Sequence, residues 1–276
     1  MTLLEQIDAA TERAQSQGAL LPLQMSGDTV SDGGVDFRVE WLSSLAMKDL
    51  AKLPRVGDKA AADFNPFLPF EAALHVADLS ETHVAILNKF PGKRGHFLII
   101  TRAFVDQTAP LDAGDFEASA RALAETGGLF FYNSGSDSGA SQRHRHMQIM
   151  PGYVAPIETV LPKDGYTQAG SAPLPFRNTF RRWDLQRAAD PAELMGKTVA
   201  RFYEAFDIAP DARPYNLAMT NDWFLAVPRV REHSEGLSIS GPSVVGLMGL
   251  RTHDQIEVVR AHGPMRMLTE VIGPRP

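Results

Sequence analysis

The chain has 276 residues, of which 44% are hydrophobic and 22% charged, as in an ordinary globular protein. Its formal net charge of −6 argues against a general nucleic-acid binder, because such proteins use basic surfaces to displace counterions. The absence of cysteine excludes disulfides, thiol nucleophiles and cysteine-ligated metals. No apolar run approaches the roughly 18–20 residues that span a bilayer, and no basic leader region opens the sequence. We therefore expect a cytoplasmic protein without nucleic-acid or membrane partners.

The N-terminal third gives few clear elements. A helix is predicted over residues 3–15, with Leu3, Leu4 and Ile7 on its apolar side. The next 50 residues are rich in Gly and Asp and allow no assignment. The segment 65–70, Asn-Pro-Phe-Leu-Pro-Phe, predicts a rigid turn because proline fixes its own φ.

The middle of the chain predicts strands and one helix. Runs 83–89 and 96–101 are β-patterned and are separated by a loop with Pro and Gly, which indicates a hairpin. Asp112 is placed to N-cap a helix that ends near residue 126, where two glycines follow. The apolar run 129–132 is then expected to be a strand that leads into a loop of small residues.

The C-terminal part is loop-like up to about residue 178. Asp190 followed by proline predicts a helix start, and Asn221-Asp222 predicts a tight turn between strands 215–220 and 223–227. A further strand is expected over 243–250. Because hairpins outnumber helices, the pattern favours an α+β fold with an antiparallel sheet flanked by helices. We expect a catalytic part at 1–165 and a part at 166–276 that completes the substrate site, within one compact unit.

The most informative segment places His144, His146 and Gln148 at alternate positions. On a β-strand these three side chains would project from one face, and Arg145, Met147 and Ile149 would project from the other. The preceding loop of small residues, 133–141, can approach phosphates closely because glycine leaves the backbone N–H groups accessible. The combination suggests nucleotidyl transfer through a phosphorylated histidine.

A neutral imidazole is a good nucleophile near pH 7, and its attack on a phosphorus would give a covalent intermediate. His146 is the expected nucleophile. Two other interpretations remain open from the residues alone. The histidines could be ordinary surface or hydrogen-bonded core residues. They could also share a zinc ion, whose further ligands would come from His75, His83, His96 or distant carboxylates.

Several segments, taken together, resemble the diadenosine tetraphosphate phosphorylases, also called ATP adenylyltransferases, of the histidine-triad superfamily. The resemblance rests on the following residues in order: 65–69, Leu87-Asn88-Lys89-Phe90-Pro91, 96–101 with Gln107, Asn133-Ser-Gly, 138–142, the motif 144–148, 215–220, Trp223 and 227–229. In this branch a glutamine replaces the third histidine of the triad.

The resemblance implies a histidine-triad-like fold and an enzyme that cleaves diadenosine tetraphosphate with inorganic phosphate, giving ATP and ADP through an adenylyl-histidine. It implies that His146 is the nucleophile, that the carbonyl of His144 orients it and that Gln148 donates to a phosphate oxygen. The implied substrate contacts are Lys48, Asn88, Lys89, Asn133, Gly139, Ala140, Ser141 and Gln142. Lys52 or Lys59 could take the place of Lys48.

The C-terminal segment departs from the family pattern, which has an Asn-led, Gly-rich stretch there. Ser240 stands in place of the asparagine, Leu247 lies further along the segment and Arg251 would supply the last positive charge. Pro242 stiffens this turn, which affects how the distal phosphates or the second nucleoside would lie.

Other activities stay open at this point. They are hydrolysis with water as the acceptor, ADP-forming adenylylsulfate chemistry or another nucleotidyl transfer, and nucleotide sensing without turnover. The expected partners are a small nucleotide and inorganic phosphate. No resident cofactor or metal is implied, although Mg²⁺ held by substrate phosphates would leave little trace in a sequence. The oligomeric state is not indicated.

Overall fold

The computed structural model describes residues 1–43, 65–163, 171–208 and 213–275. Within these ranges the centre is an eight-stranded sheet with the order β3-β4-β5-β7-β6-β9-β10-β8, and every neighbouring pair is antiparallel. Its strands are β3 (His75–Asp78), β4 (His83–Leu87), β5 (Phe97–Thr101), β6 (Leu129–Asn133), β7 (His146–Met150), β8 (Thr179–Arg182), β9 (Tyr215–Met219) and β10 (Trp223–Pro228). The expected α+β class is confirmed, and β7, which carries most of the central motif, lies in the middle of the sheet.

The strands around the centre are buried on both faces. Every residue of β4, β5, β6, β9 and β10 is buried. These strands therefore read as continuous apolar runs, because further layers of the molecule cover both sides of the sheet. The predicted hairpins β4–β5 and β9–β10 are confirmed.

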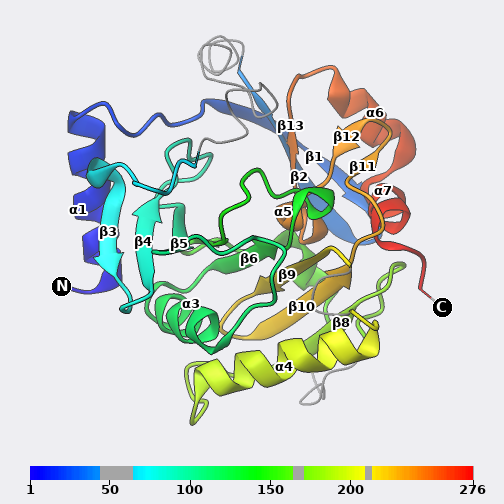
Figure 1. Cartoon of the computed structure of the whole chain (residues 1–276). Coiled ribbons are helices and arrows are strands. Elements are labelled where there is room, and N and C mark those ends of the chain that lie inside the picture. Colours follow the sequence, from blue (N-terminus) through cyan, green and yellow to red (C-terminus); the bar gives the residue numbers. More distant parts are fainter. Residues whose placement is uncertain (44–64, 164–170, 209–212, 276) are drawn as a thin grey trace.

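Three helices pack against one edge and one face of this sheet: α1 (Leu3–Ser16), α3 (Ala113–Thr126) and α4 (Pro191–Ala205). They lie to the left of and below the sheet in Figure 1. As predicted, Asp112 caps α3, and it forms a capping box with Asp115. In α1 the expectation for Leu4 is wrong, since its side chain is 42% exposed and the buried stripe continues through alanines instead.

The segment without a sequence assignment forms a hairpin on the other face. Strands β1 (Met25–Asp32), β2 (Val35–Leu42) and β13 (Leu247–Leu250) make a small sheet, with β13 parallel to β2. Gly33 and Gly34 have positive φ and make the turn. Apolar and charged residues alternate from Val35 to Val39, in step with the burial of β2, and this alternation in the sequence was a readable signal for the strand. Together with α6 (Gln255–His262) and α7 (Pro264–Ile272), this layer encloses a second hydrophobic core against the main sheet.

The predicted strand 243–250 is half wrong. Residues Gly241–Val244 form a short helix, α5, with a proline in its first turn, and only Leu247–Leu250 is a strand. Gly246, at φ 100°, lets the chain reverse between the two elements while packing against Pro156. The remaining short elements are η1 (Ala72–Leu74), η2 (Ser136–Ser138), η3 (Pro156–Thr159), β11 (His233–Ser234) and β12 (Leu237–Ser238).

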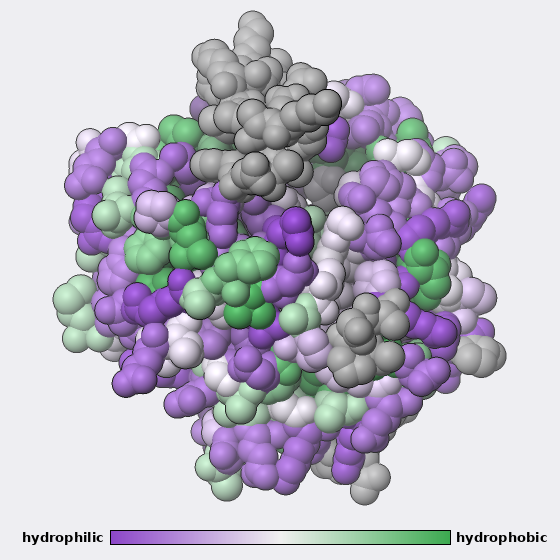
Figure 2. All heavy atoms as spheres, viewed as in Figure 1, coloured by the Kyte–Doolittle hydropathy of each residue, from purple (hydrophilic) through white to green (hydrophobic). Residues whose placement is uncertain are grey.

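Figure 2 shows a largely hydrophilic face on which hydrophobic residues occur in small groups. Among the described residues, no helix combines the length and the apolar character that crossing a membrane requires.

Candidate active site

The central motif adopts the alternating geometry that its spacing predicts. β7 begins at His146, and His144 lies just before it in an isolated β-bridge with Asp106. Met147 and Ile149 are buried in the hydrophobic core on the helical side of the sheet. His146 and Gln148 therefore lie on the opposite side, toward the loops and the second layer.

The imidazole of His146 is held in one tautomer. Its Nδ1 lies 2.8 Å from the carbonyl oxygen of His144. A carbonyl only accepts, so Nδ1 carries the proton and Nε2 keeps its lone pair. Nε2 has no hydrogen-bond partner among the described residues. The side chain is buried, and this loss of hydration lowers the pKa of His146 to about 4. The ring is therefore neutral at pH 7 and chemically ready to act as a nucleophile.

The backbone of His146 is clamped by one buried side chain. Oε1 of Gln107 accepts from the backbone N–H of His146 at 2.8 Å, and Nε2 of Gln107 donates to the His146 carbonyl at 3.2 Å. The same nitrogen donates to the carbonyl of Asn133 at 2.6 Å. Gln107 thus joins β7 to the start of the small-residue loop. The family resemblance includes Gln107, but no role for this residue could be inferred from the sequence.

The side chain of His144 is fully engaged in structural contacts. Its Nε2 donates to the carbonyl of Thr101 at 2.7 Å, and its Nδ1 lies 3.0 Å from Nδ2 of Asn65. The rings of Phe67 and Phe104 contact it edge-on. Burial lowers the pKa of His144, so this ring is also neutral at pH 7. What His144 offers to the site is its carbonyl oxygen.

Gln148 lies beside His96, which the sequence suggested only as a possible zinc ligand. Nε2 of His96 is 3.0 Å from Oε1 of Gln148. The amide nitrogen of Gln148 has no acceptor in the described part of the chain. His96 also packs against Phe131, with ring centroids 5.7 Å apart, and burial lowers the pKa of His96 to about 4.

The loop 134–142 presents backbone N–H groups beside the motif. Its first turn is the 3-10 helix Ser136–Ser138, followed by Gly139 in the left-handed region at φ 90°. The N–H groups of Ser141 and Gln142 find no acceptor in the described ranges, and both residues, with Ala140, are at least partly exposed. Such free donors suit an anion.

Asn133 ties this loop to the C-terminal part. Its Oδ1 accepts from Nδ2 of Asn216 at 2.8 Å and from the backbone N–H of Gly241 at 2.9 Å. Its own Nδ2 donates to the carbonyl of Gly139 at 3.4 Å. The structure therefore places Asn133 as a buried joint, and it brings Ser240, the residue before Gly241, against Gly139.

Other expected substrate contacts are more dispersed. Asn88 turns its Nδ2 toward Nδ1 of His96 at 3.3 Å, and Lys89 forms an ion pair with Glu71 at 2.6 Å. Lys48, with its alternatives Lys52 and Lys59, lies outside the described residues.

Leu247 and Arg251 lie in and directly after β13, in the small sheet. Leu247 pairs with Arg38 of β2. The Arg251 side chain is exposed, and its backbone N–H donates to Gln255. The contacts described above do not join either residue to His146 or Gln148. The structure thus gathers His144, His146, Gln148, Asn133, the loop 139–142 and Ser240, and leaves these two at the small sheet.

A buried charged group lies directly behind the motif. Arg145 is 1% exposed, and its Nη1 lies 2.6 Å from Oδ2 of Asp115. The other oxygen of Asp115 is 3.0 Å from Nε2 of His83. Nη2 of Arg145 donates to the carbonyls of Ala109 and Pro110. Arg145 therefore braces the segment that leads away from Gln107, on the face opposite the site.

The part of the chain that the structure describes holds no group of three or more His, Asp or Glu side chains arranged to bind a metal ion. Of the histidines considered as zinc ligands, His83 pairs with Asp115 and His75 with Asp78.

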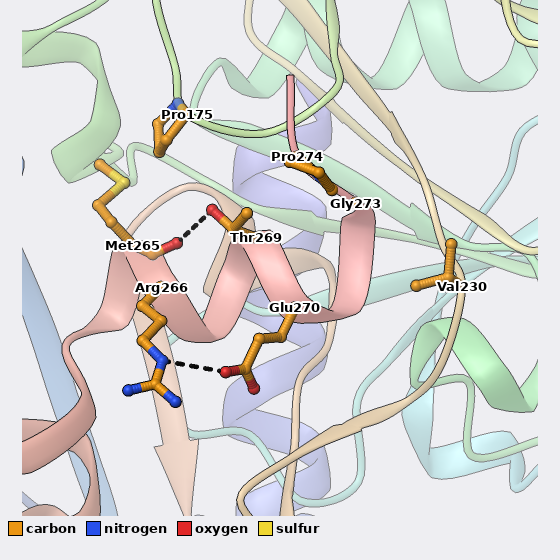
Figure 3. A pocket seen from close by; sticks show the side chains of 8 residues that line it. All are labelled: Pro175, Val230, Met265, Arg266, Thr269, Glu270, Gly273 and Pro274. Carbon is orange, nitrogen blue, oxygen red and sulfur yellow. Dashed lines mark hydrogen bonds and ion pairs between the residues drawn. The ribbon is translucent and has the colours of Figure 1, made fainter. Parts of the chain in front are cut away.

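A shallow groove lies beside α7, away from the motif. It is lined by Pro175, Val230, Met265, Arg266, Thr269, Glu270, Gly273 and Pro274 (Figure 3). Arg266 and Glu270 pair with each other, and Thr269 donates to the carbonyl of Met265. None of the expected site residues lines this groove. We therefore place the site at β7, where the free donors and the neutral imidazole are.

Comparison with known proteins identifies relatives of this chain. The chain is 28% identical over 256 residues to diadenosine 5′,5‴-P1,P4-tetraphosphate phosphorylase 2 of Saccharomyces cerevisiae, which covers 79% of this chain and 77% of that protein. It is 25% identical over 200 residues to Protein APA1 of the same yeast, covering 62% and 61%. The crystal structure of yeast Ap4A phosphorylase Apa2 in complex with Ap4A superposes with a TM-score of 0.83 at 19% identity, covering 100% of each chain, which establishes a shared fold.

Family models account for nearly the whole sequence. Residues 1–167 match the Ap4A phosphorylase N-terminal domain. Residues 172–274 match the ATP adenylyltransferase C-terminal domain. The first match alone spans more than half of the 276 residues. The chain therefore belongs to the Ap4A phosphorylase family.

Proposed function

We propose that this protein is a nucleotidyltransferase that cleaves diadenosine tetraphosphate with inorganic phosphate to ATP and ADP. The observation that carries the proposal is the tautomer of His146, whose Nδ1–H is directed to the carbonyl of His144 so that Nε2 is free to attack. Membership of the Ap4A phosphorylase family and the name of the yeast relative supply the substrate.

We propose that the reaction proceeds in two displacements. Nε2 of His146 attacks the α-phosphorus of one adenosine, the N–P bond forms and the bridging P–O bond breaks, and ATP leaves. The ring then carries AMP, and its positive charge is offset by the Nδ1–H bond to the His144 carbonyl. An oxygen of inorganic phosphate next attacks the same phosphorus, the N–P bond breaks, and ADP leaves with His146 neutral again. One difficult displacement is split into two easier ones.

The surrounding donors stabilise the charge that develops on the phosphoryl oxygens. We assign this role to the Gln148 amide and to the backbone N–H groups of Ser141 and Gln142, which have no other acceptor among the described residues. The N–H groups of Gly139 and Ala140 donate to carbonyls within the loop, so these two residues would line the phosphates by shaping the loop. Preorganised donors of this kind are typically worth a large share of a catalytic effect. Asn88, Lys89, Asn133 and Ser240 would shape the nucleotide site. The substrate contacts expected for Lys48, Leu247 and Arg251 stay predictions.

The choice of acceptor distinguishes this proposal from hydrolysis. Gln148 is a neutral amide and cannot take a proton from water, whereas phosphate arrives already ionised and needs less help. Among the described residues around His146, the two other imidazoles, His96 and His144, are both engaged by hydrogen bonds at both nitrogens. Phosphorolysis is therefore favoured over hydrolysis.

The test is a comparison of products with and without phosphate. Incubation with diadenosine tetraphosphate should yield equal amounts of ATP and ADP when phosphate is present, and no net turnover without it. Mass spectrometry of the 144–148 peptide, after a quench that avoids acid, should show an AMP-sized adduct. Formation of AMP and ATP without phosphate would instead establish a hydrolase, and binding without products would establish a sensor.

We further propose that residues 1–165 carry the nucleophile and 166–276 complete the substrate site, in a cytoplasmic protein. Two contacts support a single compact unit. The main sheet continues from β6 into β9, and Asn133 holds both Asn216 and Gly241. A cytoplasmic location is consistent with the lack of cysteine and is tested by fractionation of cells that express the protein.

A further inference from the structure

Gln148 can serve the site in two opposite ways, depending on how its amide is turned. With the NH₂ group toward the substrate it donates hydrogen bonds to phosphoryl oxygens, which only accept. With its oxygen toward the substrate it repels them. The carbon skeleton is the same in both cases, so neighbouring groups must decide the orientation.

A series of hydrogen bonds leads from the β4–β5 hairpin to this amide. The backbone N–H of Phe90 donates to Oδ1 of Asn88 at 3.0 Å. Nδ2 of Asn88 lies 3.3 Å from Nδ1 of His96, and Nε2 of His96 lies 3.0 Å from Oε1 of Gln148. We call these contacts the Asn88–His96–Gln148 series.

The direction of the whole series follows from its first member. A backbone N–H can only donate, so the atom of Asn88 that it meets is the oxygen, and the other end of the amide is the NH₂ group. That group donates to Nδ1 of His96, which must therefore be unprotonated. A neutral imidazole then carries its proton on Nε2 and donates it to the oxygen of Gln148. The amide nitrogen of Gln148 is left to face the site.

The protein scaffold holds these groups in place. Asn88 and His96 pair across the hairpin through the backbone bond from Asn88 N–H to the His96 carbonyl at 2.9 Å. Leu98, two residues beyond His96, is opposite Gln148 in the β5–β7 register, so the three polar groups lie on one face. Phe131 of β6, which lies beyond β7 in the sheet, packs on the His96 ring. Burial keeps the pKa of His96 near 4, so that the ring is neutral at pH 7 and the required tautomer is available.

We propose that Asn88 and His96 are positioning residues that fix the Gln148 amide with its NH₂ group toward the transferred phosphoryl group. This inference rests on the proposed function for the identity of the acceptor. It also changes the role of Asn88, which acts on the reacting group through His96 and Gln148 and not by touching it.

The first experiment reads the tautomer without any substrate. NMR of protein labelled with ¹⁵N at histidine should show that His96 is protonated at Nε2 and unprotonated at Nδ1 at pH 7. The His96 signals are assigned by comparison with H96F. The variant N88L removes the donor to Nδ1 and should make both tautomers visible. A wild-type His96 protonated at Nδ1 would overturn the proposal, because Gln148 would then have to donate to His96.

The second experiment is a double-mutant cycle with Gln148. H96F should lower kcat for phosphorolysis by about 10- to 100-fold, as loss of an orienting partner commonly does, with a change in KM of less than about threefold. In a Q148M background the same H96F change should alter kcat by less than about twofold, because the amide it orients is gone. H233F, at an exposed histidine far from the motif in sequence, is the matched control and should leave kcat unchanged.

The outcomes separate the two proposals. Equal losses from H96F in both backgrounds would mean that His96 acts on folding or on another group, and the positioning role would be rejected. An inactive wild-type protein would reject the proposed function, while the NMR result would still decide the direction of the hydrogen bonds.

Discussion

Gly139 and Ser240, one from each part of the chain, pack so closely that a Cβ added to Gly139 would lie 2.8 Å from the Cβ of Ser240 and 2.9 Å from its Cα. Gly139 also has φ 90°, a conformation that other residues rarely adopt. The small-residue loop therefore takes its shape from the C-terminal segment as well as from its own sequence.

We expect Gly139→Ala to displace this loop. The new methyl group would strain the backbone and push on the main chain at residue 240, so kcat/KM should fall by at least about tenfold and stability by about 1–3 kcal/mol. Gly236→Ala is the matched control, since Gly236 also has positive φ (74°) but nothing within 4 Å of the added Cβ. Steady-state kinetics and urea unfolding of both variants provide the measurement. Equal losses of activity in the two variants would show that packing against Ser240 is irrelevant.

We expect His146→Asn to abolish turnover while the protein remains folded. The side chain is of similar size, but an amide cannot form the N–P bond, so kcat should fall by at least about 10⁴-fold. The AMP-sized adduct should disappear from the 144–148 peptide. Circular dichroism and thermal unfolding check that the fold is retained. A variant that keeps more than a few per cent of the activity would contradict the assignment of the nucleophile.

Gln107→Met should impair both stability and catalysis. It leaves a buried N–H and two buried carbonyls without the partners they have at 2.8, 3.2 and 2.6 Å. Unsatisfied buried groups cost about 1–3 kcal/mol each, so a net loss of about 2–4 kcal/mol is expected once relaxation is allowed for. Because the His146 backbone is released, kcat should fall more than KM rises. The exposed Gln186→Met change, which removes one hydrogen bond to Ala124, serves as the control and should cost less than about 1 kcal/mol. An unchanged kcat in Gln107→Met would argue against the clamp.

Activity should persist to lower pH than an ordinary histidine nucleophile allows. Burial holds the pKa of His146 near 4, below its usual 6.5, so the acidic limb of kcat/KM should fall near pH 4 if binding is unaffected. Between these two values the folded protein binds fewer protons than the unfolded chain, so the free energy of unfolding falls as the pH is lowered through that window.

His96 has the same effect on the pH dependence of the free energy of unfolding, because its pKa is also near 4. Urea unfolding between pH 7 and pH 4.5 should therefore show a decline in stability that is smaller in both His146→Asn and H96F. A decline of the same size in both variants and the wild type would mean that other groups cause it.

Arg145→Met should be strongly destabilising although it leaves the site face intact. It removes the charge that faces Asp115 and leaves that carboxylate buried, a change that typically costs about 3–5 kcal/mol. Arg143→Met is the matched control, because the Arg143 side chain is 81% exposed and its ion pair with Asp106 should contribute no more than about 1 kcal/mol. Urea unfolding of the two variants gives the comparison. Similar losses would show that the buried ion pair does not stabilise the fold.

Local patterns predicted much of the secondary structure correctly. The helix capped by Asp112 and the hairpin around Asn221-Asp222 have signals within a few residues, because capping groups and turn residues act on their own backbone. The hairpin of β1 and β2 was missed, although its Gly33-Gly34 turn and the alternation after it were readable. The predicted strand 243–250 begins inside the short helix Gly241–Val244, because a short apolar run does not distinguish a helix from a strand.

By itself, the sequence determined the alternation of His144, His146 and Gln148, the family and the chemistry that a neutral imidazole makes available. These depend on residue identity and on the period of a strand. Only the tertiary structure decided which nitrogen of each histidine is free, that Gln107 clamps β7, that Asn88 meets His96 and that Ser240 packs on Gly139. The physical reason is that hydrogen bonds and steric contacts act over about 3–4 Å, and the partners come from strands and loops that folding alone brings together.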